Sequence, residues 1–164
     1  NRLTFDDAGV YTIAALYIGT GFHFMAAIIN ANLGIAILGY VFAVVWSTDI
    51  AAYMVGRKIG KHKLWPVISP NKTWEGSIGA VICAVIVAAV YVALVPTGRN
   101  NVLMIILAFF LSIIGQMGDL VESAYKRFYG VKDSGKILPC HGGILDRFDS
   151  MLFVLPVVAF MGIL

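Results

Sequence analysis

The sequence is poor in charged residues. Only 13% of its 164 residues are Asp, Glu, Lys or Arg, while 60% are hydrophobic and the mean hydropathy is +0.87. A soluble domain carries about 25% charged residues. A chain of this size cannot bury so much apolar surface in a water-facing globule, so the composition predicts that lipid is its solvent. The formal net charge of +3 is too small to indicate a nucleic-acid partner.

Cysteine is scarce as well, and no secretory signal pattern is present. Cys83 lies in an apolar run and Cys140 in a polar one, so we expect two free thiols at different depths and no link to an oxidising compartment. The chain begins at Asn1 and not at Met, so we expect a piece of a longer protein with further spans before Asn1. The length suits one domain, residues 1–164.

Long apolar stretches predict the fold. A helix needs about 20 apolar residues to cross a bilayer. Helices are expected because an open strand edge in lipid would leave backbone polar groups unsatisfied. The predicted fold is therefore all-α, a polytopic transmembrane helical bundle. The expected helices are residues 10–30, 33–56, 76–95 and 102 to about 125, and a fifth begins near 150 and reaches 164.

The distribution of positive charge predicts the topology. With the N-terminus inside, the long polar loops 57–75 and 126–149 lie on one side of the membrane and the tight connections 31–32 and 96–101 on the other. Eleven of the twelve Lys and Arg residues then lie on the side of the long loops, and only Arg99 lies opposite. This bias places the long loops in the cytoplasm, where they could line one polar cavity. Simple orientation of the protein would explain the sign of these charges but not the crowding of Asp, His, Gly and Lys in the loops.

Three acidic residues, Asp49, Asp119 and Glu122, interrupt apolar stretches. A carboxylate at mid-bilayer costs ~2.5–3.5 kcal/mol on insertion scales, so such groups mark functional sites by default. Asp119, Ser123 and Lys126 are spaced to share one helix face. Snorkelling at a helix end would explain Lys126 but neither Asp119 nor Ser123.

The second polar loop carries further carboxylates beside a glycine pair. Gly142 and Gly143 permit close approach of a ligand to the backbone. Asp146 and Asp149 are three residues apart at the start of the next helix, so they share a face. Together with Asp119 they make an oxygen-ligand site of the kind that Mg²⁺ uses, and one His with one Cys is too few for zinc.

The first polar loop ends in a turn and a helix start. Asn71 stands beside a proline, and Lys72 and Thr73 directly precede the expected third helix. A helix N-terminus is a favoured place for phosphate, although an ordinary capped helix start fits these residues equally well. The spacing is not that of a Walker loop.

Three blocks of the sequence together resemble a known family. They are Ser123-x-x-Lys126-Arg127 with Lys132-Asp133 and Pro139-x-His141-Gly142-Gly143-x-x-Asp146-Arg147-x-Asp149; Ser69-Pro70-Asn71-Lys72-Thr73-Trp74-Glu75-Gly76; and Trp46-x-x-Asp49-x-x-Ala52-Tyr53. This pattern resembles the signature of the CDP-diacylglycerol synthases, the phosphatidate cytidylyltransferases, over about residues 46–150. Tyr125 and Cys140 depart from the residues that the family more often has.

The resemblance implies an activity. CTP and phosphatidic acid would give CDP-diacylglycerol and pyrophosphate in phospholipid biosynthesis. The chain would then be a single membrane-embedded catalytic domain that depends on Mg²⁺, with a second cation, Mg²⁺ or K⁺, as a further expectation. The resemblance also implies a homodimer surrounded by membrane lipids in the bacterial cytoplasmic membrane, with its active site on the cytoplasmic side.

The expected site residues fall into two groups. Asp119, Asp146 and Asp149 are expected to bind the metal and, with Ser123 and Lys126, to act in the reaction. The expected substrate-binding residues are Asp49, Asn71, Lys72, Thr73, Arg127, Lys132, Asp133, His141, Gly142, Gly143 and Arg147. His141 could equally fix the loop.

Other functions compete with this interpretation. A cytidylyltransferase for an archaeal ether lipid would have a similar site, and a CTP-dependent polyprenol kinase would transfer the γ-phosphate. A transporter or channel would place ionisable residues across the middle of several helices, whereas here they crowd one end. A purely structural membrane subunit would not need them.

Overall fold

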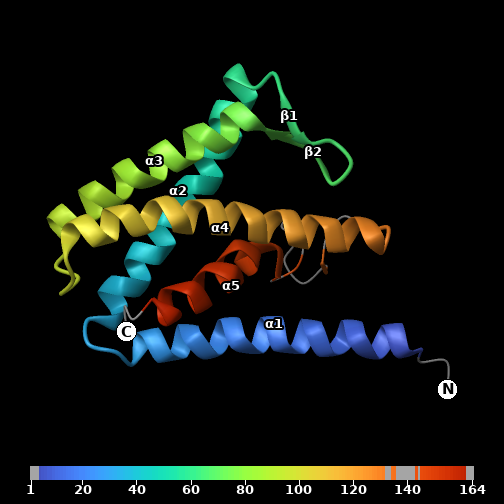
Figure 1. The fold of residues 1–164 in the computed structure, drawn as a ribbon, viewed down its shortest axis with the longest axis horizontal. Helices are drawn as coiled ribbons and strands as arrows, with labels where there is room; N and C mark the ends of the chain where they lie inside the picture. Colours follow the sequence, from blue (N-terminus) through green and yellow to red (C-terminus); the bar gives the residue numbers. More distant parts are fainter. Residues whose placement is uncertain (1–3, 132–133, 136–142, 144, 162–164) are drawn as a thin grey trace.

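The computed structural model describes residues 4–131, 134–135, 143 and 145–161, and within them the chain forms five helices and a short hairpin (Figure 1). The helices α1 to α4 are long and apolar enough to cross a membrane. These helices confirm the all-α, polytopic fold. In chain order the elements are α1 (Phe5–Ile29), α2 (Gly34–Ile59), β1 (Lys63–Trp65), β2 (Ser69–Thr73), α3 (Trp74–Leu94), α4 (Asn101–Phe128) and α5 (Leu145–Phe160).

Each helix that was expected to start or end at a polar loop continues beyond its apolar run. The helix α1 begins at Phe5 because Thr4 and Asp7 form a capping box there. Basic residues occupy the last turns of α2 and α4, where they complement the helix dipole. Hydropathy alone predicts the length of a membrane span but not these polar extensions.

The hairpin is a feature that the all-α prediction did not include. The strands β1 and β2 pair antiparallel, and β2 leads directly into α3, whose N-cap is Thr73. The Glu75 carboxylate accepts hydrogen bonds from the backbone N–H of Lys61 and His62 and lies 2.6 Å from the His62 ring. Strands of three and five residues with a proline have too little alternation to be recognised from sequence.

Small residues let α2 and α3 approach closely. One face of α3 is buried, and a Cβ added to Gly76 would lie 2.7 Å from the Ala52 carbonyl oxygen of α2. Close approach at small residues is a common way to pack helices in lipid. The buried face consists of Gly76, Ala80, Ala84, Ala88 and Val92, and the opposite face presents Ile78, Ile82, Ile86 and Val90, each more than half exposed.

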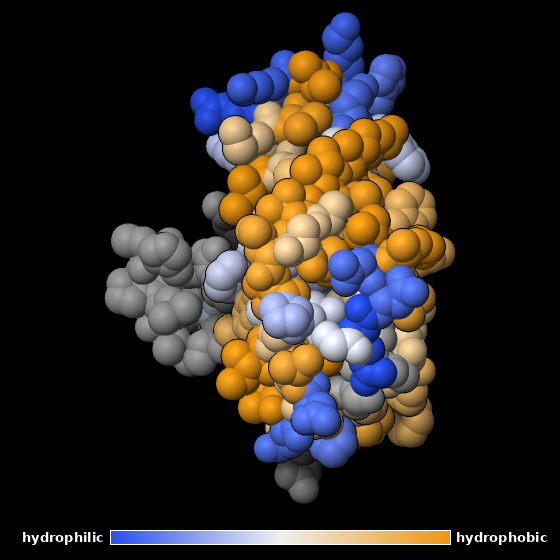
Figure 2. All heavy atoms as spheres, turned by 90° about the vertical axis from the view of Figure 1, so that its left-hand side faces the viewer, coloured by the Kyte–Doolittle hydropathy of each residue, from blue (hydrophilic) through white to orange (hydrophobic). Residues whose placement is uncertain are grey.

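The helix α5 lies between α4 on one side and α1 on the other (Figure 1). Apolar side chains cover most of the face seen in Figure 2, with hydrophilic groups at its top and bottom and in a patch to the right of its middle. Large apolar side chains are exposed on all four long helices. Such a surface suits a chain whose surroundings are lipid.

Candidate active site

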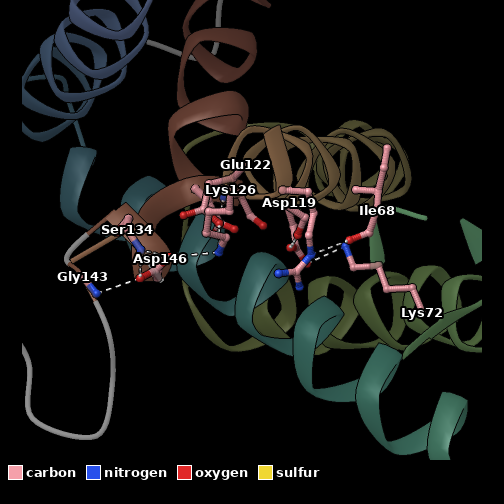
Figure 3. A network of polar contacts seen from close by, with 12 residues as sticks. Ile68, Lys72, Asp119, Glu122, Lys126, Ser134, Gly143 and Asp146 are labelled. Carbon is pink, nitrogen blue, oxygen red and sulfur yellow. Dashed lines mark hydrogen bonds and ion pairs between the residues drawn. The ribbon is translucent and has the colours of Figure 1, made fainter. Parts of the chain in front are cut away.

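An ion pair connects the hairpin to α4. The Lys72 Nζ of β2 lies 2.6 Å from the Asp119 Oδ2 of α4, and both side chains are largely shielded from solvent (Figure 3). The Lys72 Nζ is buried but its alignment with Asp119 does not meet hydrogen-bond geometry. This ammonium therefore has donors left for another partner.

Lys72 and Asp119 line a polar cavity of about 190 Å³. The cavity lies where the hairpin, α2, α3 and α4 meet, and Thr73 is the N-cap of α3 at its edge. Polar side chains lining it are Asp49, Tyr53, Asn71, Lys72, Thr73, Ser77, Gln116 and Asp119. The structure thus brings together five predicted residues from one polar loop and two membrane spans: Asp49, Asn71, Lys72, Thr73 and Asp119.

A second ion-pair cluster lies one turn further along α4. The Lys126 Nζ is 2.5 Å from the Glu122 Oε2 and 2.9 Å from the Asp146 Oδ1 of α5. All three side chains are shielded, with exposed fractions of 18% for Lys126, 4% for Glu122 and 10% for Asp146. The other Glu122 oxygen is buried and has no hydrogen-bond partner among the residues that the structure describes.

Asp146 also fixes the backbone on either side of it. Its carboxylate accepts hydrogen bonds from the N–H of Gly143 at 2.7 Å and of Ser134 at 2.9 Å (Figure 3). Burial raises the pKa of the Asp146 carboxyl, but the Lys126 ammonium and the two N–H groups lower it by more, so the pKa lies well below its usual range. Asp146 is therefore a charged anchor that ties α4, α5 and the segment between them together.

Asp149 connects the two clusters. Its side chain is within electrostatic range of Asp119 and Asp49 and close to Glu122. Its backbone carbonyl accepts a hydrogen bond of 2.7 Å from the Tyr17 hydroxyl of α1. The predicted trio of Asp119, Asp146 and Asp149 therefore belongs to one continuous acidic region.

Among the described side chains this region has more negative than positive charge. Five carboxyl groups share two ammonium groups, a surplus of three negative charges if all are ionised. A surplus of hard oxygen ligands suits a divalent cation such as Mg²⁺. In the described part of the chain, however, no three His, Cys, Asp or Glu side chains are already placed to hold a metal ion. The metal ligands therefore stay a prediction.

The remaining predicted residues divide between described and undescribed parts. The Ser123 hydroxyl lies 3.4 Å from the Asp119 Oδ1, as expected for one helix face. The Arg127 Nε donates to the Ile68 carbonyl at 3.4 Å, which joins the end of α4 to the hairpin tip. Gly143 donates its N–H to Asp146. The structure does not describe the other predicted residues or Cys140; these are Lys132, Asp133, Cys140, His141, Gly142 and the side chain of Arg147.

Sequence reasoning missed two contributors to this region. Glu122 was recognised as an acid in an apolar span but not as the partner of Lys126, although their spacing of four residues is typical of helix ion pairs. Tyr17 was not among the predicted site residues, because no local pattern indicates that its hydroxyl reaches α5.

A chain of polar side chains extends from the polar cavity into the apolar core. Ser77 of α3 donates to the Gln116 amide oxygen at 2.6 Å, and the Gln116 nitrogen lies 3.4 Å from the Ser112 hydroxyl. Thr48 of α2 donates to the same Ser112 hydroxyl at 3.0 Å. Hydrogen bonds between helices of this kind satisfy polar groups that lipid cannot satisfy.

The fold and the site define a class of protein, a polytopic membrane protein with a lysine- and carboxylate-rich region at one end of its helices. The chain belongs to the cytidylyltransferase family, whose sequence profile matches residues 1–164. This confirms the family predicted from the motifs.

The chain aligns with part of the length of two bacterial relatives. It is 50% identical over 162 residues to the phosphatidate cytidylyltransferase of Bacillus subtilis (strain 168), an alignment that covers 98% of this chain and 60% of the relative. It is 53% identical over 158 residues to that of Staphylococcus haemolyticus (strain JCSC1435), covering 96% and 60%. The chain thus spans 60% of the length of these two relatives.

Proposed function

We propose that this chain carries the reaction centre of a phosphatidate cytidylyltransferase, which converts CTP and phosphatidic acid to CDP-diacylglycerol and pyrophosphate. The observation that carries the proposal is the arrangement of two partly buried lysines, Lys72 and Lys126, on either side of an acidic region in a membrane protein. The names of the relatives support the same activity.

The reaction requires two polyanions to meet. A phosphate oxygen of phosphatidic acid attacks the α-phosphorus of CTP, the new P–O bond forms, and pyrophosphate leaves. A phosphomonoester has a second pKa of about 6, so the attacking group is already mostly dianionic at neutral pH and needs no strong base. Positioning and neutralisation of charge are therefore the main tasks of the site.

The carboxylates of Asp119, Asp146 and Asp149 would hold Mg²⁺, which supplies charge neutralisation to the nucleotide phosphates. Asp49 lies within electrostatic range of Asp119 and Asp149 and would add an oxygen ligand. Asp146 already accepts two backbone N–H groups, and the Asp119 oxygens contact Lys72 and Ser123, so a metal would compete with these contacts. The surplus of negative charge leaves room for a second cation, Mg²⁺ or K⁺.

The lysines would exchange partners when the substrates bind. In the structure Lys72 pairs with Asp119 and Lys126 with Glu122 and Asp146. Lys72 and Lys126 would release these carboxylates, which would be free to hold Mg²⁺, and would donate to phosphate oxygens instead. Lys72 has unused donors for this role, and Arg127, at the mouth of the region, suits a two-pronged phosphate contact.

The positive-inside bias supports a site on the cytoplasmic side of a bacterial cytoplasmic membrane, where CTP is present. Residues 1–164 would form a single catalytic domain with a polar cavity open to the cytoplasm. The protein would work as a homodimer with phosphatidic acid, CTP and membrane lipids as its partners.

The test uses the protein as its gene encodes it, purified in detergent with Mg²⁺ and phosphatidic acid. With CTP labelled in the α-phosphate the label should enter lipid, and with the γ-phosphate labelled it should leave as pyrophosphate. Formation of CDP would instead indicate the polyprenol kinase. An ether-lipid phosphate used in preference to phosphatidic acid would indicate the archaeal-type enzyme.

The Asp149→Asn and Asp119→Asn variants test the site itself. Each should lower turnover by at least about 100-fold, since a lost ligand or ligand-orienting group typically costs 10–100-fold or more. Asp7→Asn, at the N-terminus of α1, is the matched control and should retain turnover. Turnover at the wild-type rate in both site variants would remove the metal assignment.

A further inference from the structure

The hairpin formed by β1 and β2 has two faces with different surroundings. Leu64 of β1 and Lys72 of β2 line the polar cavity, so the inner face of the hairpin is turned toward the candidate site. Successive side chains of a strand point to opposite faces, so Lys63 and Trp65 project away from the cavity on an outer face. Both of these side chains are exposed, and the site described above makes no use of them.

Large apolar side chains are exposed on the hairpin and at the two helix ends that it joins. Trp65 is 54% exposed, and Val67, in the turn between the strands, is 83% exposed. Ile59, the last residue of α2, and Trp74, the first residue of α3, are also more than half exposed. Tryptophan is enriched where a protein crosses from hydrocarbon to water, so this composition indicates a membrane interface as the surroundings of the hairpin.

The connections of the hairpin hold it close to that interface. Only residues 60–62 separate β1 from the end of α2, and β2 leads directly into α3 (Figure 1). Both α2 and α3 are long and apolar enough to cross a membrane. Three residues of extended chain span at most about 11 Å, so the hairpin cannot move far from the point where these helices leave the hydrocarbon. It therefore lies at the level of the lipid headgroups.

The charge of this segment is positive and largely unpaired. Four exposed basic residues lie on the hairpin and at the end of α2: Arg57, Lys58, Lys61 and Lys63. None of the four forms an ion pair with a described residue. The one acid among residues 57–75 is Glu75, whose carboxylate already accepts the backbone N–H groups of Lys61 and His62. Basic clusters directly outside a membrane span bind anionic headgroups.

We propose that the outer face of the β1–β2 hairpin, together with the basic end of α2, binds anionic phospholipid headgroups of the leaflet beside it. Trp65 and Val67 lie among the glycerol groups and upper acyl chains, and Lys61 and Lys63 pair with phosphates. A soluble acidic protein or a nucleic acid would match the charges but would leave the tryptophan and the valine in water. This surface is turned away from the candidate site, so the inference goes beyond the proposed function.

The binding of headgroups has a consequence for the inner face. The same hairpin carries Lys72, which pairs with Asp119 of α4, and the Ile68 carbonyl, which accepts a hydrogen bond from Arg127 of α4. Lipid contacts on the outer face therefore add to the contacts that hold Lys72 beside Asp119.

A fluorescence experiment tests which lipid lies against the outer face. In the full-length protein Trp46 and Trp74 are replaced by Phe, as is any tryptophan outside residues 1–164, so that Trp65 is the sole tryptophan. The protein is placed in phosphatidylcholine vesicles with a minor share of phosphatidylglycerol, which is anionic but has no phosphomonoester that could react. Bromine, which quenches tryptophan fluorescence, is carried on the acyl chains either of the phosphatidylglycerol or of an equal amount of the phosphatidylcholine.

Brominated phosphatidylglycerol should quench Trp65 at least about twofold more than brominated phosphatidylcholine, because each lysine near an anionic surface favours association by about fivefold. The excess should shrink at about 1 M salt, where the Debye length is about 3 Å. A protein with Trp46 as its sole tryptophan, in the middle of α2 and 56% exposed, is the control for position. Its quenching should show a smaller preference between the two lipids.

Charge variants identify the groups responsible. The double variant Lys61→Gln/Lys63→Gln should lose the preference for phosphatidylglycerol at Trp65 and leave the quenching of Trp46 unchanged. It should retain turnover in detergent, because neither lysine is among the described residues that line the polar cavity. Lys61→Arg/Lys63→Arg keeps both charges and should keep the preference, which separates loss of charge from a disturbed hairpin.

Three results would overturn the proposal. Equal quenching of Trp65 by the two brominated lipids shows that the face has no preference for anionic headgroups. Absence of quenching by either lipid shows that water or a second copy of the chain covers the face. A preference that persists in Lys61→Gln/Lys63→Gln shows that these lysines do not cause it. The fluorescence measurement needs no CTP, so its outcome does not depend on the proposed function.

Discussion

Removing the Lys126 ammonium should destabilise the protein as well as inactivate it. Lys126→Met preserves most of the side-chain volume but leaves Glu122, 4% exposed, without the cation with which it pairs. Breaking a buried ion pair from one side costs about 3–5 kcal/mol. Asp146 keeps its two backbone N–H donors, so we expect the lower end, about 3 kcal/mol.

The second substitution identifies the cause. Glu122→Gln in the Lys126→Met background removes the unpaired charge, so it should recover more than half of the lost stability without restoring turnover. Thermal unfolding in detergent measures both effects. A loss of about 3 kcal/mol corresponds to a decrease of roughly 6–12 °C in Tm for a chain of this size.

The control and the refuting result are equally specific. Lys58→Met removes an exposed lysine at the end of α2 and should leave the Tm and turnover close to those of the wild type. If Lys126→Met unfolds at the wild-type temperature, or if the double variant is no more stable than Lys126→Met alone, then the buried charge of Glu122 is not what Lys126 balances.

Two further predictions concern packing and positioning. Ala84→Leu adds volume to the buried face of α3 against α2 and should lower stability by about 1–3 kcal/mol, while Ala93→Leu on the exposed side should be neutral in a parallel thermal unfolding experiment. Tyr17→Phe removes the hydroxyl that donates to the Asp149 carbonyl, so it should cost about 1 kcal/mol of stability and lower kcat more than it raises either KM. A kcat equal to that of the wild type would show that Tyr17 does not help to position Asp149.

The predictable part of this fold comes from features that repeat along a segment. Hydropathy predicts the four membrane spans because each needs a long run of apolar residues whatever its neighbours are. The hairpin was not predictable, because β1 and β2 are too short to carry a pattern and depend on Glu75 and Thr73 at the start of α3. The hairpin forms through local hydrogen bonds, which cannot be inferred from composition.

The site was predictable to the level of residues but not of pairs. Motif spacing predicted that Asp119, Asp146 and Lys126 belong to one region, and in the structure Lys126 pairs with Asp146 while Asp119 pairs with Lys72. It could not predict that Lys72 would pair with Asp119, because this contact joins elements 47 residues apart in the chain. The pairing of Lys126 with Glu122 follows from helix geometry and could have been found by considering every acid four residues from a base.

The hydrogen-bonded side chains Thr48, Ser112, Gln116 and Ser77 have a mechanical consequence for α2, α3 and α4. If any one of these helices rotated about its own axis, a polar side chain would lose its hydrogen bond and face hydrocarbon. The hydrogen bonds therefore fix the rotation of the three helices relative to one another. Asp49 directly follows Thr48, and the register that this polar chain imposes therefore sets the direction in which that carboxylate points. A substitution deep in the apolar interior can in this way misalign the acidic region without altering a single charge.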